Sequence, residues 1–393
     1  MKISKRVQNI TASQSLEMAA RCRRMREAGI NVISMSVGEP DFDTPEHIRR
    51  AAQDAIENHW SHYGAVAGIP TLRQAVAAQQ NSRSGNAIRW EGEDVIVSVG
   101  AKMAIFDAIQ ALINPGDEVI IPVPAWVSYC EMVRLAEGTV VEVPTRMEER
   151  YCLTPDQLRA AITPRTRLLI LCSPNNPTGS IYSRETLDAL VEVLRDWPDV
   201  TVLSDEIYSQ LVYAGECVSF GAYPELADRL VLVNGVSKSY AMTGYRIGWL
   251  ISKNKAFVSG CTRLQGQQLT CATMVAQRAA EAALTGPQDC VVQMREAFDK
   301  RRQLICNLAR KIKGFRFDEP QGAFYLFPDV RQLFSARIPS VDALVEYLLQ
   351  EAHVATVSGA AFGCPDCIRL SYAISSDEII EAMNRIYEAI DKL

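Results

Sequence analysis

Short apolar runs alternate with amphipathic stretches through the middle of the chain. Seven runs of five or six residues lie between about residues 94 and 251, and each has the length of a buried strand: VIVSV, EVIIP, TVVEV, RLLILC, VTVLS, LVLVN and RIGWLI. Helix-period stretches separate them, for example at residues 101–113 and 183–197. This alternation predicts an α/β fold in which helices cover both faces of a mostly parallel sheet.

The two ends of the chain show a different pattern. Near the C-terminus, helical stretches at residues 290–311 and 376–390 flank the strand-like pieces GFRF, GAFYLFP and CIRLSYA, which predicts a smaller α+β domain. The start of the chain has a predicted helix at residues 13–28 and the Gly/Pro-rich segment VGEPDFDTP, and we expect it to pack with the small domain. The predicted division is an N-terminal arm with part of the small domain at 1–45, a large domain at 46–285 and a small C-terminal domain at 286–393.

Composition narrows the class of protein. The chain has 393 residues, of which 48% are hydrophobic, so it can build two cores. Charged residues make up 22% and the net charge is -5, which leaves no strongly basic face for nucleic acid. The segment MKISKRVQNITASQ has no apolar stretch behind its charges, and no later apolar run is long enough to span a bilayer. We therefore expect no nucleic-acid or membrane partner and a cytoplasmic location.

The eleven cysteines are odd in number and scattered, mostly within apolar runs, which favours reduced thiols. Cys364 and Cys367 alone have CxxC spacing. Because no second pair or His cluster completes a zinc site, the sequence predicts no metal.

Candidate chemistry follows the strands, because ligands of open α/β sheets bind beyond the carboxyl ends of the strands. After VIVSV, the turn Gly100-Ala101-Lys102 leads into a helix and offers free backbone N–H groups to a phosphate, although any βα turn can use glycine. After RLLILC comes the rigid loop SPNNPTG, where Asn175 and Asn176 supply donors and acceptors.

The next strand end carries a carboxylate and a phenol, Asp205 and Tyr208. The carboxylate suits a protonated ring nitrogen and the phenol suits a ring oxygen. The alternative is a helix-capping Asp with a core Tyr.

Lys238 lies between two serines at the end of LVLVN, an unusual place for a solvated charge. Desolvation near another cation would lower its pKa and make it a nucleophile for a carbonyl. Ser237 and Arg246 are candidates for binding a phosphate. The string does not fit GxxxxGK[ST], so a nucleotide P-loop is not supported.

Arg369 lies on the strand-like stretch CIRLSY. A buried arginine needs a partner, and its planar fork matches a carboxylate. On these residues alone, a salt bridge to an internal Asp or Glu is a better interpretation than a substrate carboxylate.

Taken together, these strings resemble the class I aminotransferases of the pyridoxal 5'-phosphate (PLP) fold type I, most closely the prokaryotic aspartate aminotransferase-like branch. The resemblance covers nearly the whole chain, in family order: VGEPDFDTPEHI, HYGAVAGIPTLRQAV, PAWVSYCEMVRLAEG, ITPRTRLLILCSPNNPTG, SDEIY, SKSYAMTGYRIGW, GAFYLF and IRLSYA. It implies a large domain with a seven-stranded sheet, PLP as cofactor, and a smaller domain formed by both termini.

The resemblance also implies roles at the cofactor ring. Lys238 would carry PLP as a Schiff base, and Asp205 would pair with the pyridine nitrogen. Asn176 and Tyr208 would bind the ring oxygen, and Trp126 would stack on the ring face. The catalytic set is Lys238, Asp205 and Tyr208.

Further roles concern the phosphate and the substrate. The residues implied at the phosphate are Gly100, Ala101, Lys102, Ser237 and Arg246. Tyr63 would reach the phosphate of a neighbouring subunit, which implies a homodimer with shared active sites. Arg369 would hold the substrate α-carboxylate with support from Asn176 and the Gly38 backbone, and Trp126 would also contact the substrate.

The expected reaction moves an amino group from an L-amino acid to a 2-oxo acid by a ping-pong mechanism, with aspartate and 2-oxoglutarate as the expected pair. Lys102 supports a dicarboxylic substrate, because a lysine in the GxK string is associated with the distal carboxylate in this branch; the alternative is a lysine that serves the phosphate or solvent. Thr11–Ser15 departs from the pattern of relatives that accept prephenate, which weakens that option.

Other donors stay open, namely alanine, aromatic and methionine-type amino acids. A PLP-dependent carbon–sulfur β-lyase would use the same Lys238 and Asp205. A dehydrogenase would need GxGxxG after the first strand, and a regulator built on this fold would need a DNA-binding domain ahead of VGEPDF; we expect neither.

Overall fold

The computed structural model describes residues 1–11, 14–83 and 87–393, without the side chains of residues 14–16. In the stretch compared with prephenate-accepting relatives, Ala12 and Ser13 therefore lie outside the described residues.

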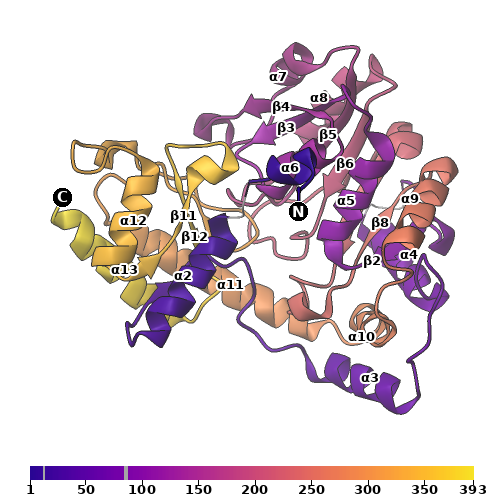
Figure 1. The fold of residues 1–393 in the computed structure, drawn as a ribbon, viewed down its shortest axis with the longest axis horizontal. Helices are drawn as coiled ribbons and strands as arrows, with labels where there is room; N and C mark the ends of the chain where they lie inside the picture. The colour runs from indigo at the N-terminus through magenta and orange to yellow at the C-terminus, as the bar shows by residue number, and fades with distance from the viewer. Residues whose placement is uncertain (12–13, 84–86) are drawn as a thin grey trace.

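A seven-stranded sheet forms the centre of the larger part of the molecule (Figure 1). Its strands lie in the order β2-β8-β7-β6-β5-β3-β4, and β8 runs in the direction opposite to the other six. The strands are β2 (Val95–Ser98), β3 (Glu118–Val123), β4 (Thr139–Pro144), β5 (Thr166–Cys172), β6 (Thr201–Asp205), β7 (Leu230–Gly235) and β8 (Gly248–Ile251). The predicted α/β fold with a mostly parallel sheet is confirmed.

Alternate residues of each strand enter two different cores, as the two-residue period of a strand requires. In β2, Val95 and Val97 pack into one core, and Ile96 packs into the other. The first core is completed by α3 (Glu46–Glu57), α4 (Pro70–Arg83), α7 (Pro155–Ala161), α8 (Arg184–Arg195) and α10 (Met274–Thr285). The second is completed by α5 (Gly100–Leu112), α6 (Ser128–Leu135) and α9 (Lys255–Gln268). Burial on both faces explains why the strands other than β4 are apolar runs without polar alternation, whereas β4 lies at the sheet edge and is partly exposed.

Local signals set the helix ends. Thr154 caps α7 in a capping box with Gln157, and Pro155 occupies the first helical position, where its missing N–H has no cost. At the start of α8, Ser183 is likewise a cap, because its side chain accepts a hydrogen bond from the backbone N–H of Thr186.

Elements from both chain ends pack together beside the large sheet. β1 (Ile33–Ser34) pairs in parallel with β10 (Val354–Ala355), and β11 (Val357–Ser358), β12 (Ile368–Ser371) and β9 (Tyr325–Leu326) form a three-stranded antiparallel sheet. Figure 1 shows α2 (Gln14–Glu27) beside the C-terminal helices, and Arg21 of α2 forms an ion pair with Glu346 of α12. The remaining helices are α1 (Lys5–Gln8), α11 (Asp289–Ala309), α12 (Val341–Glu351) and α13 (Ser376–Asp391).

The GFRF piece, expected as a strand, contributes only an isolated bridge between Arg316 and Asp329. The chain turns at Gly314, which has a φ of 88°, and after this turn Arg316 alone pairs with Asp329, so no longer strand forms.

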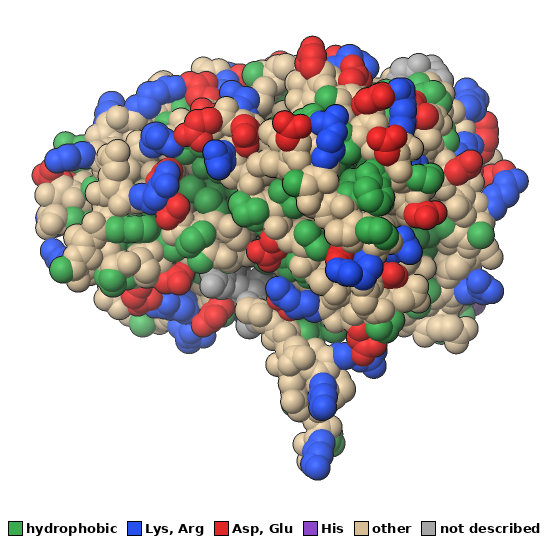
Figure 2. Space-filling model, turned by 90° about the horizontal axis from the view of Figure 1, so that it is seen from above, with side chains coloured by type: hydrophobic (Ala, Val, Ile, Leu, Met, Phe, Trp, Pro, Cys, Tyr) green, Lys and Arg blue, Asp and Glu red, His purple; other side chains and the backbone are tan. Residues whose placement is uncertain are grey.

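Figure 2 shows lysine and arginine interspersed with aspartate and glutamate over one face, and a narrow extension that projects beyond the lower edge of this view. Within the described ranges, no helix combines the length and the apolar character needed to cross a bilayer.

Candidate active site

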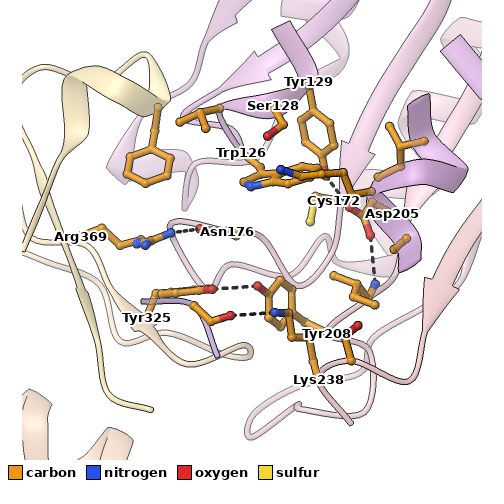
Figure 3. A pocket seen from close by; sticks show the side chains of 18 of the residues that line it. Trp126, Ser128, Tyr129, Cys172, Asn176, Asp205, Tyr208, Lys238, Tyr325 and Arg369 are labelled. Atoms are coloured by element: carbon orange, nitrogen blue, oxygen red, sulfur yellow. Dashed lines mark hydrogen bonds between the residues drawn. The ribbon is translucent and has the colours of Figure 1, made fainter. Parts of the chain in front are cut away.

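A cavity of about 260 Å³ opens where the parallel strands of the large sheet end. All the predicted site residues except Gly100 and Tyr63 line it: Gly38, Ala101, Lys102, Trp126, Asn176, Asp205, Tyr208, Ser237, Lys238, Arg246 and Arg369. Figure 3 shows Arg369 and Asp205 at opposite ends of the cavity, with Trp126 along one wall. Residues far apart in the sequence meet here because β5, β6 and β7 are neighbours and end at the same edge of the sheet.

Lys238 follows β7 and points into the cavity (Figure 3). Its Nζ donates a hydrogen bond of 2.7 Å to the backbone oxygen of Gly38. Burial lowers the pKa of the Lys238 ammonium group to about 8; Glu39 opposes this shift, and Arg246 adds to it. A Cβ at position 38 would lie 2.3 Å from the Tyr325 hydroxyl oxygen, so the close approach of the backbone to Tyr325 requires glycine. Lys238 thus has the lowered pKa that a nucleophilic amine needs.

Asp205 ends β6 and is only 4% exposed. It accepts hydrogen bonds from the Tyr129 hydroxyl at 2.6 Å and from the backbone N–H of Ile207 at 3.1 Å. Burial raises the pKa of Asp205 to about 6, and the bond from Tyr129 counteracts part of that rise. Because a turn rather than a helix follows β6, the alternative interpretation of Asp205 as a helix cap is wrong.

Arg369 is a buried cation, 3% exposed, on β12. One Nη donates to Asn176 Oδ1 at 3.0 Å, the other donates to the Ser36 oxygen at 2.6 Å, and Nε has no hydrogen-bond partner among the residues that the structure describes. The guanidinium carbon lies 4.5 Å from the Tyr325 ring centroid and 5.0 Å from that of Phe362. None of the ion pairs among the described residues involves Arg369, so no internal salt bridge explains it. Burying a charge without a counter-charge is costly, and an anionic ligand would remove that cost.

Asn176 and Tyr208 lie between these two ends (Figure 3). Asn176 uses its carbonyl oxygen for Arg369, which leaves its amide N–H groups as donors toward the cavity. The Tyr208 hydroxyl shares a hydrogen bond of 2.8 Å with the Tyr325 hydroxyl. Both side chains therefore hold fixed orientations before any ligand binds.

The first turn of α5 and Arg246 form a second anion-binding feature. Gly100 has a φ of 79°, and a Cβ there would lie 2.5 Å from Arg246 Nη2, so glycine lets the guanidinium lie over the helix start. Arg246 is itself in the left-handed region, with a φ of 56°, and is held by a bond from Nη1 to the Thr243 oxygen at 2.8 Å. Free N–H groups and the positive helix end beside a guanidinium are suited to a phosphate.

Lys102 extends from the same turn toward Trp126, with 4.9 Å between its Nζ and the ring centroid. Partial burial lowers the pKa of Lys102, and Arg246 lowers it further.

The charges that line the cavity are unbalanced: among the described lining residues, four cations face one carboxylate, Asp205; the cations are Lys102, Lys238, Arg246 and Arg369. Such an excess of positive charge attracts anions and favours their binding. The cavity is therefore suited to a ligand with several negative groups.

Two predicted residues lie outside the cavity lining. Gly100 lies directly behind Ala101, where it makes room for Arg246. Tyr63 lies between α3 and α4 and is 87% exposed, so it does not contribute to the site of its own chain.

Sequence reasoning missed eight of the lining residues: Ile105, Val127, Ser128, Tyr129, Cys172, Ile207, Tyr325 and Phe362. Tyr129 follows Trp126 by three residues, so a helical start at that point brings both to one face, and their rings meet at 5.2 Å. Tyr325 lies within GAFYLF, but its contact with Tyr208 is a long-range pairing that no local pattern indicates.

An α/β fold whose strand ends carry a cationic cavity, lined by a lysine of lowered pKa, is suited to an enzyme that acts on small anionic ligands. The model of the aminotransferase class I and II family matches residues 30–386. An aspartate/prephenate aminotransferase of Nitrosomonas europaea is 43% identical over 395 residues, which cover 98% of this chain and 99% of that protein. An aspartate aminotransferase of Geobacillus stearothermophilus is also 43% identical, over 100% of this chain and 99% of its own.

Solved structures agree with the sequence relatives. The aspartate aminotransferase of Rhizobium meliloti superposes with a TM-score of 0.96 at 39% identity, over 100% of both chains. That of Thermus thermophilus with maleate gives 0.93 at 38% identity, over 99% of this chain and 100% of that one. The chain belongs to the class I and II aminotransferase family and is an aminotransferase, as its sequence predicts.

Proposed function

We propose that the cavity binds PLP through Lys238 and transfers the amino group of L-aspartate to a 2-oxo acid, with 2-oxoglutarate as the expected acceptor. One observation carries the proposal: a lysine of lowered pKa and a buried guanidinium, which has no carboxylate partner in the described part of the chain, line the same cavity. An amino acid can present its amine to the first and its carboxylate to the second.

The residues present fit PLP. The cradle of Gly100, Ala101 and Arg246, with Ser237 beside it, suits the phosphate. Asp205 suits a protonated ring nitrogen, because with a pKa of about 6 it is mostly ionised at neutral pH. The amide of Asn176 and the hydroxyl of Tyr208 suit the ring oxygen, and Trp126 suits the ring face. When bound, PLP withdraws electrons from the substrate Cα and stores the amino group between the two half-reactions.

The chain's own groups then have defined tasks. Arg369 binds the substrate carboxylate in a bidentate manner, while Asn176 and the Ser36 oxygen hold the guanidinium in place. This contact fixes the orientation of the substrate Cα. Lys238 Nζ, with its lowered pKa, removes the proton from that carbon. Tyr129 keeps Asp205 oriented and ionised through its hydrogen bond.

The choice of aspartate rests on the charge of the cavity and on relatives. Lys102 supplies a cation beyond those that PLP and one carboxylate need. Relatives of 43% identity are named for aspartate, and one neighbouring structure was solved with maleate, a dicarboxylate.

The test is a donor panel that follows conversion of the loaded enzyme to its pyridoxamine form with aspartate, glutamate, alanine and aromatic amino acids. Aspartate should have the highest kcat/KM; a preference for alanine or an aromatic donor would overturn the choice.

Substituting Lys102 should change donor preference. In Lys102→Met the stem remains and the charge is lost, so kcat/KM for aspartate should fall roughly 10- to 100-fold, the loss of one charged hydrogen bond. Alanine, which has no distal carboxylate, should lose far less. Steady-state kinetics with both donors measures this, with Lys102→Arg as the control that keeps the charge. An equal loss for both donors would assign Lys102 to the phosphate instead.

The lowered pKa of Lys238 predicts how the cofactor-free protein captures PLP as pH changes. Only the neutral amine attacks an aldehyde. With a pKa of about 8, roughly one amine in ten is neutral at pH 7, against about one in three thousand for an unshifted lysine. The capture rate should therefore rise with pH, reach half its maximum near pH 8 and then level off. Stopped-flow absorbance measures it, and a rate still rising toward pH 10 would show that the pKa is not lowered.

We further propose a homodimer in which Tyr63 of each chain completes the phosphate site of the other. The support is its 87% exposure and its absence from the described lining of its own cavity, in a chain whose fold matches a solved relative over its whole length. The test is a hybrid dimer of Lys238→Ala and Tyr63→Ala chains, co-expressed with different tags. One of its two sites would have both native residues, so the hybrid should bind PLP at that site with native affinity and show about half of the native activity. If Tyr63 acts within its own chain or not at all, the hybrid site that keeps Lys238 should bind PLP no more tightly than a site of the Tyr63→Ala homodimer.

A further inference from the structure

Cys364 and Cys367 lie in the loop between the short helix η7 (Gly359–Phe362) and β12, outside the cavity lining. Their sulfur atoms are 3.5 Å apart, and both thiols are free. Cys364 is partly exposed, between the exposed residues Gly363 and Pro365, whereas Cys367 is 1% exposed. One thiol can thus meet a small reagent from solvent, and the other lies directly behind it.

The backbone is already suited to a disulfide. Residues 364–367 form a turn in which the Cys367 N–H donates to the Cys364 oxygen at 3.3 Å. Such a turn brings its first and last Cα atoms within about 7 Å, the range that a disulfide spans. The hydrogen bond between the two thiols also lowers the pKa of Cys364, which favours the nucleophilic thiolate at the more exposed position.

Contacts connect this pair to Arg369. Cys367 belongs to a small apolar cluster with Tyr151, Phe327, Val357 and Phe362. Phe362 lies 5.0 Å from the Arg369 guanidinium, and Val357 pairs with Arg369 across β11 and β12.

The same loop reaches the ring-stacking side of the cavity. The Phe362 oxygen accepts from the backbone N–H of Ala125, next to Trp126, at 3.0 Å. A shift of Cys367 would therefore disturb two walls of the cavity. Cys367 and Arg369 are only two residues apart on the chain, so a change at one can reach the other directly.

We propose that Cys364 and Cys367 form a reversible disulfide that weakens binding of the amino-acid carboxylate at Arg369; the effect on binding rests on the proposed role of Arg369. The oxidant is a hydroperoxide. The Cys364 thiolate attacks the O–O bond, an S–O bond forms, and the other oxygen leaves with a proton as water or an alcohol. Cys367 sulfur then attacks Cys364 sulfur, the S–S bond forms, and the S–O bond breaks to release water. The two thiols lose two electrons, which the hydroperoxide gains, and a dithiol reductant reverses the change.

The experiment treats PLP-loaded enzyme with hydrogen peroxide and measures two properties. Peptide mass mapping and thiol titration after denaturation should show a Cys364–Cys367 disulfide, with two of the eleven thiols lost. KM for L-aspartate, or for whichever donor the panel identifies, should rise about three- to tenfold, with kcat changed less. Dithiothreitol should restore both properties.

Matched variants decide the result. Cys364→Ser should keep native kinetics and lose the response to peroxide, and Cys367→Ala should also lose it. Cys290→Ser, which removes another partly exposed thiol, should respond like the native enzyme. The proposal is overturned if no such disulfide forms, if it forms without a change in KM, or if Cys364→Ser still responds. Mass mapping detects the disulfide whether or not the enzyme is active. A failure to transfer amino groups would therefore refute the proposed function, and the formation of the disulfide would still be tested.

Discussion

The variant Lys238→Ala is expected to lose turnover by about ten-thousandfold or more, because it removes both the amine that carries PLP and the base that takes the Cα proton. Burial that lowers the pKa of this amine to about 8, together with its bond to the Gly38 oxygen, suits it to both tasks. Borohydride reduction of the native enzyme should link PLP to the peptide that contains Lys238. Steady-state assays and peptide mapping measure the two outcomes.

A control separates a lost reaction from a lost fold. Lys255→Ala changes an exposed lysine at the start of α9 and should leave turnover and trapping unchanged. Retained transamination by Lys238→Ala, with an adduct trapped on another lysine, would refute the assignment of this residue.

The second large effect is expected from Arg369→Leu. The variant removes the carboxylate anchor, and loss of one partner of a buried charge pair costs about 3–4 kcal/mol in binding, so kcat/KM for aspartate should fall roughly 100- to 1,000-fold. The free energy of unfolding should change by no more than about 1 kcal/mol, because the native cation is buried without a carboxylate partner among the described residues. Kinetics and denaturant titration together give this pattern of lost activity with retained stability.

Arg369→Lys tests the geometry of the anchor. It keeps the charge but loses the planar fork, so it should recover only part of the activity. Arg316→Leu, at an exposed arginine paired with Glu148, should have little effect on either measurement. A large loss of stability in Arg369→Leu with near-native kcat/KM would show that Arg369 is structural.

The sequence predicted the architecture of the large sheet because its signals are local. Each strand is an apolar run bounded by turn residues, and Val95, Ile96 and Val97 show in the structure the alternation between two cores that such a run allows. The domain boundaries at residues 45 and 285 and the cytoplasmic location stay predictions.

Part of the candidate site could also be predicted from local signals. Asp205 and Lys238 end neighbouring strands, and the rule that ligands bind at strand ends indicates both. What could not be predicted depends on how distant segments pair: the bond from Tyr129 to Asp205, the pairing of Tyr208 with Tyr325, and the absence of a carboxylate beside Arg369 among the described residues. Strand order and the packing of β9 and β12 decide these contacts, and neither is a local property.

The most direct test of the central claim is a single-turnover reaction. PLP-loaded enzyme in slight excess is mixed with L-aspartate and no 2-oxo acid, and all products are quantified. An aminotransferase built on Lys238 and Arg369 should give one equivalent of oxaloacetate per aspartate, convert the same amount of enzyme to its pyridoxamine form, and release no ammonia. Release of ammonia without formation of the pyridoxamine form, or no reaction of aspartate at all, would contradict the account.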